Sequence, residues 1–146
     1  MYVSFLFSFP ESVFCVSVHP KKDWIASGGE DDKAVVWSRE DAQIILECDK
    51  FKDSVTQVAF NHDGSYLAAA DMSGVIKVWK MACKEMVWEF ETSDILWMCW
   101  HPVGNVLFAT TADSELWMWK IPSGESKLFS GHGEKAESAE IMPDGK

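Results

Sequence analysis

The sequence predicts an all-β protein made of repeated four-stranded blades, the architecture of a β-propeller. Two observations predict it. Trp37, Trp79 and Trp119 each end a short apolar segment, and they follow one another at intervals of about 41 residues, the length of one blade. Within each interval, short runs of alternating apolar residues are separated by turn residues, and no segment has the periodicity of an amphipathic helix. Four short strands per repeat are typical of a propeller blade.

Three repeats are delimited by this pattern, residues 12–53, 54–94 and 95–135. In each of them the first apolar run stops at His19, Asn61 or His101, at the same distance before the tryptophan. Each repeat contains four apolar runs bounded by Gly, Pro, Asp, Asn or Ser, which are turn formers. The predicted strands are residues 13–18, 24–27, 34–37 and 44–46, then 55–60, 66–70, 75–79 and 86–90, then 95–100, 106–110, 116–119 and 127–129.

The two ends of the chain extend this pattern. Pro143, Asp144 and Gly145 repeat the turn that follows the first strand of a blade, so residues 136–146 are predicted to begin a fourth repeat. Residues 1–10 read as an atypical, strand-like leader. The sequence thus predicts a partial propeller of about three and a half blades, and we expect the chain to stop before the ring closes. Strand edges at residues 4–9 and 138–142 would then be unpaired.

Charge and hydropathy narrow the classes of partner. The chain has 23 acidic and 13 basic residues and a net charge of −10, which argues against nucleic acid and anionic membranes as partners. No apolar segment is long enough for membrane insertion. The acidic balance favours a protein partner with a basic, Lys/Arg-rich segment. A role in solubility alone is an equally good explanation of the same charge.

No pattern of catalytic or metal-binding residues is present. The four cysteines form no C-x-x-C pair, and each of the four histidines stands at a strand end or repeat boundary, which is the position of a turn residue. The sequence contains no nucleophile elbow, phosphate loop or zinc motif. We therefore expect no catalytic residues, no metal, no cofactor and no small-molecule substrate. Structural thiols indicate a reducing compartment.

The repeats resemble the WD40 family. Trp37, Trp79 and Trp119 occupy the place of the tryptophan in the family's third strand, and Asp31 and Asp113 occupy the place of its structural turn aspartate. The resemblance implies a β-propeller fold, blade-core roles for the tryptophans, turn roles for the two aspartates and a non-catalytic protein-binding function. The sequence departs from the family where Ser38, Lys80 and Lys120, rather than aspartate, follow the tryptophans.

A narrower resemblance is carried by longer strings, including residues 28–34 (Gly-Gly-Glu-Asp-Asp-Lys-Ala) and 117–120 (Trp-Met-Trp-Lys). They are similar to the opening repeats of one branch of the family. This resemblance implies a cytoplasmic protein. It also implies the functions of that branch, whose animal members are associated with cell migration and angiogenesis, and whose fungal relative escorts a newly made large-subunit ribosomal protein.

Three functional hypotheses follow. The first is an interaction scaffold that binds a basic segment through the loops between the second and third strands and the links between blades, with Glu30, Asp32, Asp71 and Asp94 as its acidic side chains and Trp97 and Phe51 as apolar anchors. A solvated rim without a partner explains the same acids equally well. The second is a propeller enzyme whose active groups lie in other blades. The third is a half-propeller that pairs with itself to close a ring.

Overall fold

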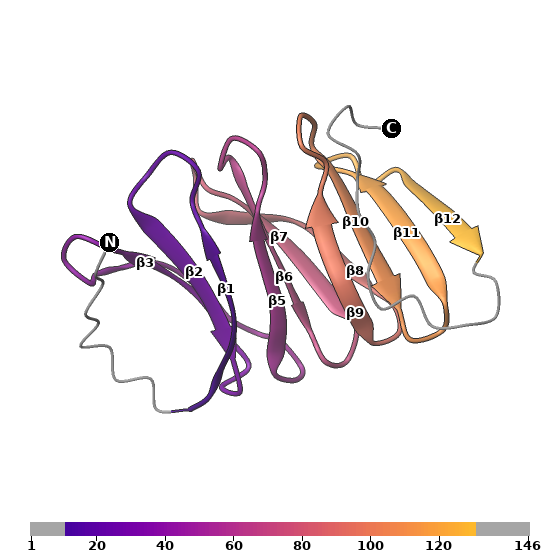
Figure 1. Cartoon of the computed structure of the whole chain (residues 1–146), viewed down its shortest axis with the longest axis horizontal. Helices are drawn as coiled ribbons and strands as arrows, with labels where there is room; N and C mark the ends of the chain where they lie inside the picture. Colours follow the sequence, from indigo (N-terminus) through magenta and orange to yellow (C-terminus); the bar gives the residue numbers. More distant parts are fainter. Residues whose placement is uncertain (1–10, 131–146) are drawn as a thin grey trace.

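The computed structural model describes residues 11–130 of the chain. Within them, consecutive strands form three antiparallel four-stranded sheets, which we call blades 1, 2 and 3 (Figure 1). Blade 1 contains β1 (Val13–Val18), β2 (Trp24–Gly29), β3 (Ala34–Ser38) and β4 (Ile44–Cys48); blade 2 contains β5 (Val55–Phe60), β6 (Tyr66–Asp71), β7 (Val75–Lys80) and β8 (Glu85–Glu91); blade 3 contains β9 (Ile95–Trp100), β10 (Val106–Thr111), β11 (Glu115–Lys120) and β12 (Ser126–Ser130).

The prediction of an all-β, bladed fold is confirmed. Residues 11–130 contain no helix, and the strands coincide with the twelve predicted apolar runs or extend them by one or two residues at one or both ends. Strand position is a local property here, because turn residues mark each end and alternation marks each strand. The predicted leader, the start of a fourth repeat and the two expected unpaired edges lie outside the described residues.

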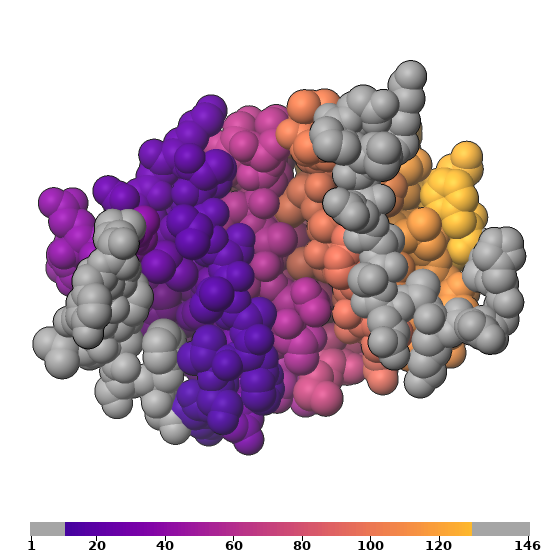
Figure 2. Space-filling view, viewed as in Figure 1, coloured from indigo at the N-terminus to yellow at the C-terminus, as the bar shows by residue number. Residues whose placement is uncertain are grey.

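The blades pack face to face in chain order, as the space-filling view shows from indigo to yellow (Figure 2). Because successive side chains in a strand point to opposite faces, each blade offers one face to its predecessor and one to its successor. One core lies between blades 1 and 2 and contains Ala26, Ala34 and Val36 against Val58, Leu67 and Trp79. The other lies between blades 2 and 3 and contains Ala68, Ala70 and Val78 against Met98, Leu107 and Trp119.

The three repeat tryptophans occupy the same strand position but different environments. Trp79 is 6% exposed and Trp119 is fully buried, because each faces the small side chains of the preceding blade. Trp37 is only half-buried, since its sheet face is turned away from blade 2. Val16 and Val18, on the same face, are 65% and 57% exposed. Trp79 and Trp119 therefore occupy the blade-core position expected of them, whereas Trp37 is only partly buried within the described residues.

Candidate interaction surfaces

The loops between strands gather at two ends of the blades. One end, which we call the link face, carries the turns between the second and third strands and the links between blades: residues 30–33, 49–54, 72–74, 92–94 and 112–114. The other end, the turn face, carries the remaining hairpin turns: residues 19–23, 39–43, 61–65, 81–84, 101–105 and 121–125. Antiparallel strands alternate in direction, so each end receives every second connection.

The link face has a strong excess of negative charge. Two of its lysines are paired, because Lys33 Nζ lies 2.7 Å from a Glu47 oxygen and Lys52 Nζ lies 2.7 Å from a Glu91 oxygen. The hydrogen bond to Glu47 raises the pKa of Lys33 above its ordinary value, so this lysine stays charged and paired with Glu47. The exposed carboxylates of this face that make no ion pair within the described residues are Glu30, Asp31, Asp32, Asp49, Asp53, Asp94 and Asp113.

Asp71 does not belong to that exposed set, and the prediction that it meets a partner is wrong. It is fully buried at the end of β6. Its Oδ1 accepts hydrogen bonds from the Ser73 amide (2.9 Å), the Ser73 hydroxyl (2.7 Å) and the Val75 amide (3.0 Å). Its Oδ2 accepts one from the Lys52 amide at 3.0 Å. Asp71 therefore ties the β6–β7 turn to the link that enters blade 2.

This turn-binding role was expected of Asp31 and Asp113. Both are exposed, and the carboxylate that satisfies turn amides is instead Asp71, at the last position of the preceding strand. The Asp-x-Ser-Gly string at residues 71–74 is a signal that could have found it, because an aspartate commonly bonds the backbone amide two residues further on.

The two predicted apolar anchors are also placed differently. Phe51 is 8% exposed, its ring centroid lies 5.9 Å from that of Trp79, and the buried Lys77 Nζ lies 4.9 Å above its ring while donating to the Lys50 carbonyl at 2.7 Å. Trp97 is half-buried on the face of β9 that points away from blade 2, opposite Thr110. Neither side chain is exposed at the loops. Of the residues predicted to bind a partner, those exposed at the link face are Glu30, Asp32 and Asp94.

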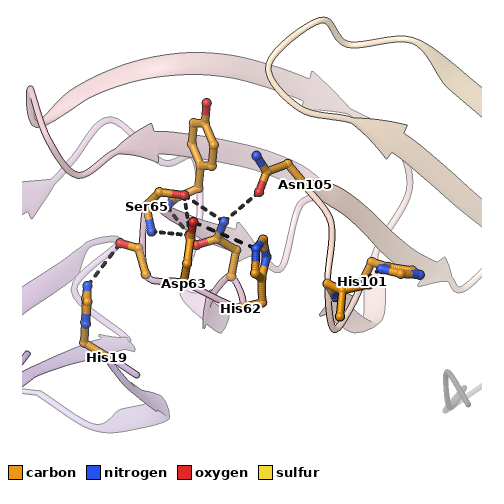
Figure 3. Close-up of polar contacts among 10 residues, drawn as sticks. His19, His62, Asp63, Ser65, His101 and Asn105 are labelled. Carbon is orange, nitrogen blue, oxygen red and sulfur yellow. Dashed lines mark hydrogen bonds and ion pairs between the residues drawn. The ribbon is translucent and has the colours of Figure 1, made fainter. Parts of the chain in front are cut away.

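The turn face is organised by hydrogen bonds that cross between blades (Figure 3). His19 Nε2 lies 3.1 Å from the Gly64 carbonyl of blade 2. In the next blade Asn61 takes the same place, and its Nδ2 donates to Asn105 Oδ1 of blade 3 at 2.8 Å. Gly64 has φ +74°, and a Cβ at this position would collide with the His19 ring, so the approach of the two turns requires glycine. The equivalent residues His19 and Asn61 thus each hold the turn of one blade against the turn of the next blade.

The His19 imidazole is held as the neutral tautomer. Its Nδ1 accepts hydrogen bonds from the amides of Lys21 (3.1 Å) and Lys22 (2.9 Å), so Nε2 carries the proton given to Gly64. Burial lowers the pKa of His19 below 6.5; among weaker effects, Lys21 and Lys22 lower it further, whereas the hydrogen bond to Gly64 and the charge of Asp63 raise it. Protonation would turn Nδ1 into a donor facing two donors.

A pH-dependent contribution to stability follows. Because folding lowers the pKa of His19, the unfolded chain binds a proton at this imidazole more readily than the folded chain does. The stabilisation that neutral His19 contributes is therefore complete above its ordinary pKa of 6.5 and is lost as the pH falls below that value. We expect the urea midpoint to fall more steeply from about pH 7.5 to about pH 5.5 in the wild type than in His19→Asn, which installs the residue of the equivalent position Asn61. Equal slopes in the two proteins would show that His19 is not the titrating group.

A hollow of about 420 Å³ opens between the turns of this face. It lies where the inner strands β1, β5 and β9 end, and its lining includes Val18, Phe60, Met98 and Trp100 together with His62 and His101. Beside it, Asp63 accepts hydrogen bonds from the Ser65 hydroxyl and amide, which lower the pKa of this carboxyl to about 2. Asp63 is therefore an ionised turn residue whose carboxylate accepts hydrogen bonds from Ser65 of the same loop.

The described residues contain no cluster suited to a metal ion, and two of their cysteines are poorly nucleophilic. Within residues 11–130, no three His, Cys, Asp or Glu side chains converge as a metal ion would require. Burial raises the pKa of the Cys15 and Cys99 thiols to about 11, which keeps both protonated and poorly nucleophilic. The described part of the chain has no helix long and apolar enough to cross a bilayer.

Three four-stranded antiparallel blades packed in series, with loops gathered on two faces, are the architecture of a β-propeller. Residues 16–95 match the family model described as the anaphase-promoting complex subunit 4 WD40 domain, and the chain belongs to the WD40 family. Members of this family generally serve as non-catalytic scaffolds and typically bind other proteins.

Within the family, the chain is 51% identical to human angio-associated migratory cell protein, over 92% of this chain and 31% of that protein. It is 28% identical to the ribosome assembly protein SQT1 of Saccharomyces cerevisiae, over 81% of this chain and 29% of that protein. The crystal structure of the RRP9 WD40 repeats superposes with a TM-score of 0.80 at 21% identity, covering 89% of this chain and 42% of that one, which supports the fold alone. The chain spans about a third of the length of these curated relatives.

Proposed function

We propose that this chain is part of a non-catalytic interaction scaffold, and that its link face binds a Lys/Arg-rich segment of a partner protein. The observation that supports the proposal is the charge arrangement of that face. Glu30, Asp32 and Asp94 are exposed, whereas Lys33 and Lys52 are occupied by ion pairs. A basic segment would therefore meet carboxylates from blade 1 and from the link into blade 3, with little competing positive charge.

The relatives indicate two settings for such a scaffold. One relative is named for migratory cells and another for ribosome assembly. We propose the corresponding roles, in cell migration and angiogenesis or in ribosome assembly, for the whole protein. A cytoplasmic location is also proposed, supported by four cysteines that are all free thiols.

The test compares two triple variants that remove the same charge. Glu30→Ser with Asp32→Ser and Asp94→Ser removes three exposed acids of the link face. The control, Glu40→Ser with Glu85→Ser and Glu89→Ser, removes three exposed acids elsewhere. Association with a synthetic Lys/Arg-rich peptide should slow about tenfold in the first protein alone, and the difference should fade with added salt because the Debye length is about 10 Å at 0.1 M. Equal rates in both variants would remove the link face as the binding surface.

A further inference from the structure

The hollow on the turn face has the size of a ligand pocket and an apolar floor. Its volume of about 420 Å³ falls within the range of about 300–1,000 Å³ that is usual for ligand pockets. Phe60, Met98 and Trp100 are almost completely buried and form a rigid apolar floor. Such a floor is suited to a bulky apolar side chain, because burial of that side chain would cost little ordering of the protein.

The rim of the hollow carries exposed apolar side chains. Val18 at the end of β1 is 57% exposed, and Pro20 and Pro102 are exposed on the two flanking turns. Val103, next to Pro102, is 72% exposed. Single exposed apolar residues are ordinary, but a group of them around a hollow marks an interaction site.

The charge beside the hollow is opposite to that of the link face. Lys21 and Lys22 are exposed in the turn that begins at Pro20, and Lys22 Nζ lies 4.2 Å from the centroid of the Trp24 ring. Two carboxylates lie near these lysines. Asp23, in the same turn, lies 3.8 Å from an Arg39 nitrogen, whereas Asp63 in the β5–β6 turn is ionised and accepts hydrogen bonds from Ser65. Lys21 and Lys22 make no ion pair within the described residues, so they outnumber Asp63 and leave a net positive charge beside the hollow.

We propose that the hollow on the turn face docks an acidic segment of a partner protein through one bulky apolar side chain. The apolar side chain lies on Phe60, Met98 and Trp100, and flanking carboxylates face Lys21 and Lys22. This goes beyond the proposed function, because it assigns a second site, on the opposite face and for a partner of opposite charge. The two faces would let one scaffold hold a basic and an acidic partner at the same time.

The test uses the chain of residues 1–146 and a fluorescein-labelled peptide of eight Asp and Glu residues around a central Leu-Phe pair. Fluorescence anisotropy gives the affinity. Lys21→Glu with Lys22→Glu should weaken binding about tenfold or more, and Val18→Ser, at an exposed rim position, should weaken it without removing charge. The matched control is Lys80→Glu with Lys84→Glu, which should leave the affinity unchanged. Both lysines are exposed, Lys80 at the end of β7 and Lys84 in the turn that follows it.

Several outcomes would overturn the proposal. One is an equal peptide affinity in the Lys21/Lys22 and Lys80/Lys84 variants. Another is an unchanged affinity when Gly-Gly replaces the Leu-Phe pair of the peptide. Tighter binding of a single-stranded RNA of equal charge would identify a nucleic-acid surface instead. Self-association of the unlabelled chain in sedimentation that is lost in Lys21→Glu with Lys22→Glu would show that the turn face binds the acidic link face of a second copy. Intact secondary structure by circular dichroism keeps each comparison valid.

Discussion

Replacing Trp119 with alanine is expected to lower the free energy of unfolding by about 3–5 kcal/mol, a large part of a domain's total stability. Trp119 is fully buried between blades 2 and 3. Its ring centroid lies 5.1 Å from that of Phe90, 5.4 Å from that of Trp88 and 5.7 Å from that of Trp117. These aromatic side chains cannot close a cavity of that size without leaving their rotamers, so little of the loss is recovered.

Trp37→Ala is the matched comparison, because Trp37 occupies the same position in blade 1 but is half-buried. It should cost clearly less, mainly through the loss of packing and of the 3.0 Å hydrogen bond from Trp37 Nε1 to Ser27 Oγ, a bond worth about 1 kcal/mol. Urea unfolding, followed by far-ultraviolet circular dichroism, measures the free energy of unfolding of both variants. An equal loss in the two variants would contradict the conclusion that Trp119 contributes the larger share of packing energy.

Asp71→Ala is expected to cost about 3 kcal/mol or more, the second large effect. The carboxylate is fully buried and accepts four hydrogen bonds, three of them from backbone amides that no other described side chain is seen to satisfy. Hydrogen bonds to a charged group contribute about 1.5–3 kcal/mol each, and buried amides left without a partner are costly. Both the β6–β7 turn and the link at Lys52 would lose their common anchor.

Asp113→Ala provides the control, since Asp113 lies in the corresponding turn of blade 3 and is exposed. Its effect should stay within about 0.5 kcal/mol. Thermal and urea unfolding of both variants, with hydrogen exchange at the Lys52, Ser73 and Val75 amides, would separate the two cases. Wild-type protection of these amides in Asp71→Ala would contradict the role assigned here.

The positions of the strands and the bladed architecture follow from the sequence alone. Turn residues and alternation are local signals, and the recurrence of Trp37, Trp79 and Trp119 fixes the length of the repeat. Trp117 and Trp119 lie two residues apart in β11 and therefore share a sheet face, and their rings are stacked. The negative charge of the link face could be foreseen from the same strand assignment.

The environment of each side chain was decided by the tertiary structure. Asp71 is buried because its carboxylate reaches the amide of Lys52, a residue of the preceding link that only sheet packing brings close. Phe51 is buried because β7 places Trp79 and Lys77 against it, and Trp37 is half-buried because its sheet face is turned away from blade 2. Periodicity determines which face of a strand a residue occupies, but burial depends on what packs against that face, and the packing partners lie one blade away in the sequence.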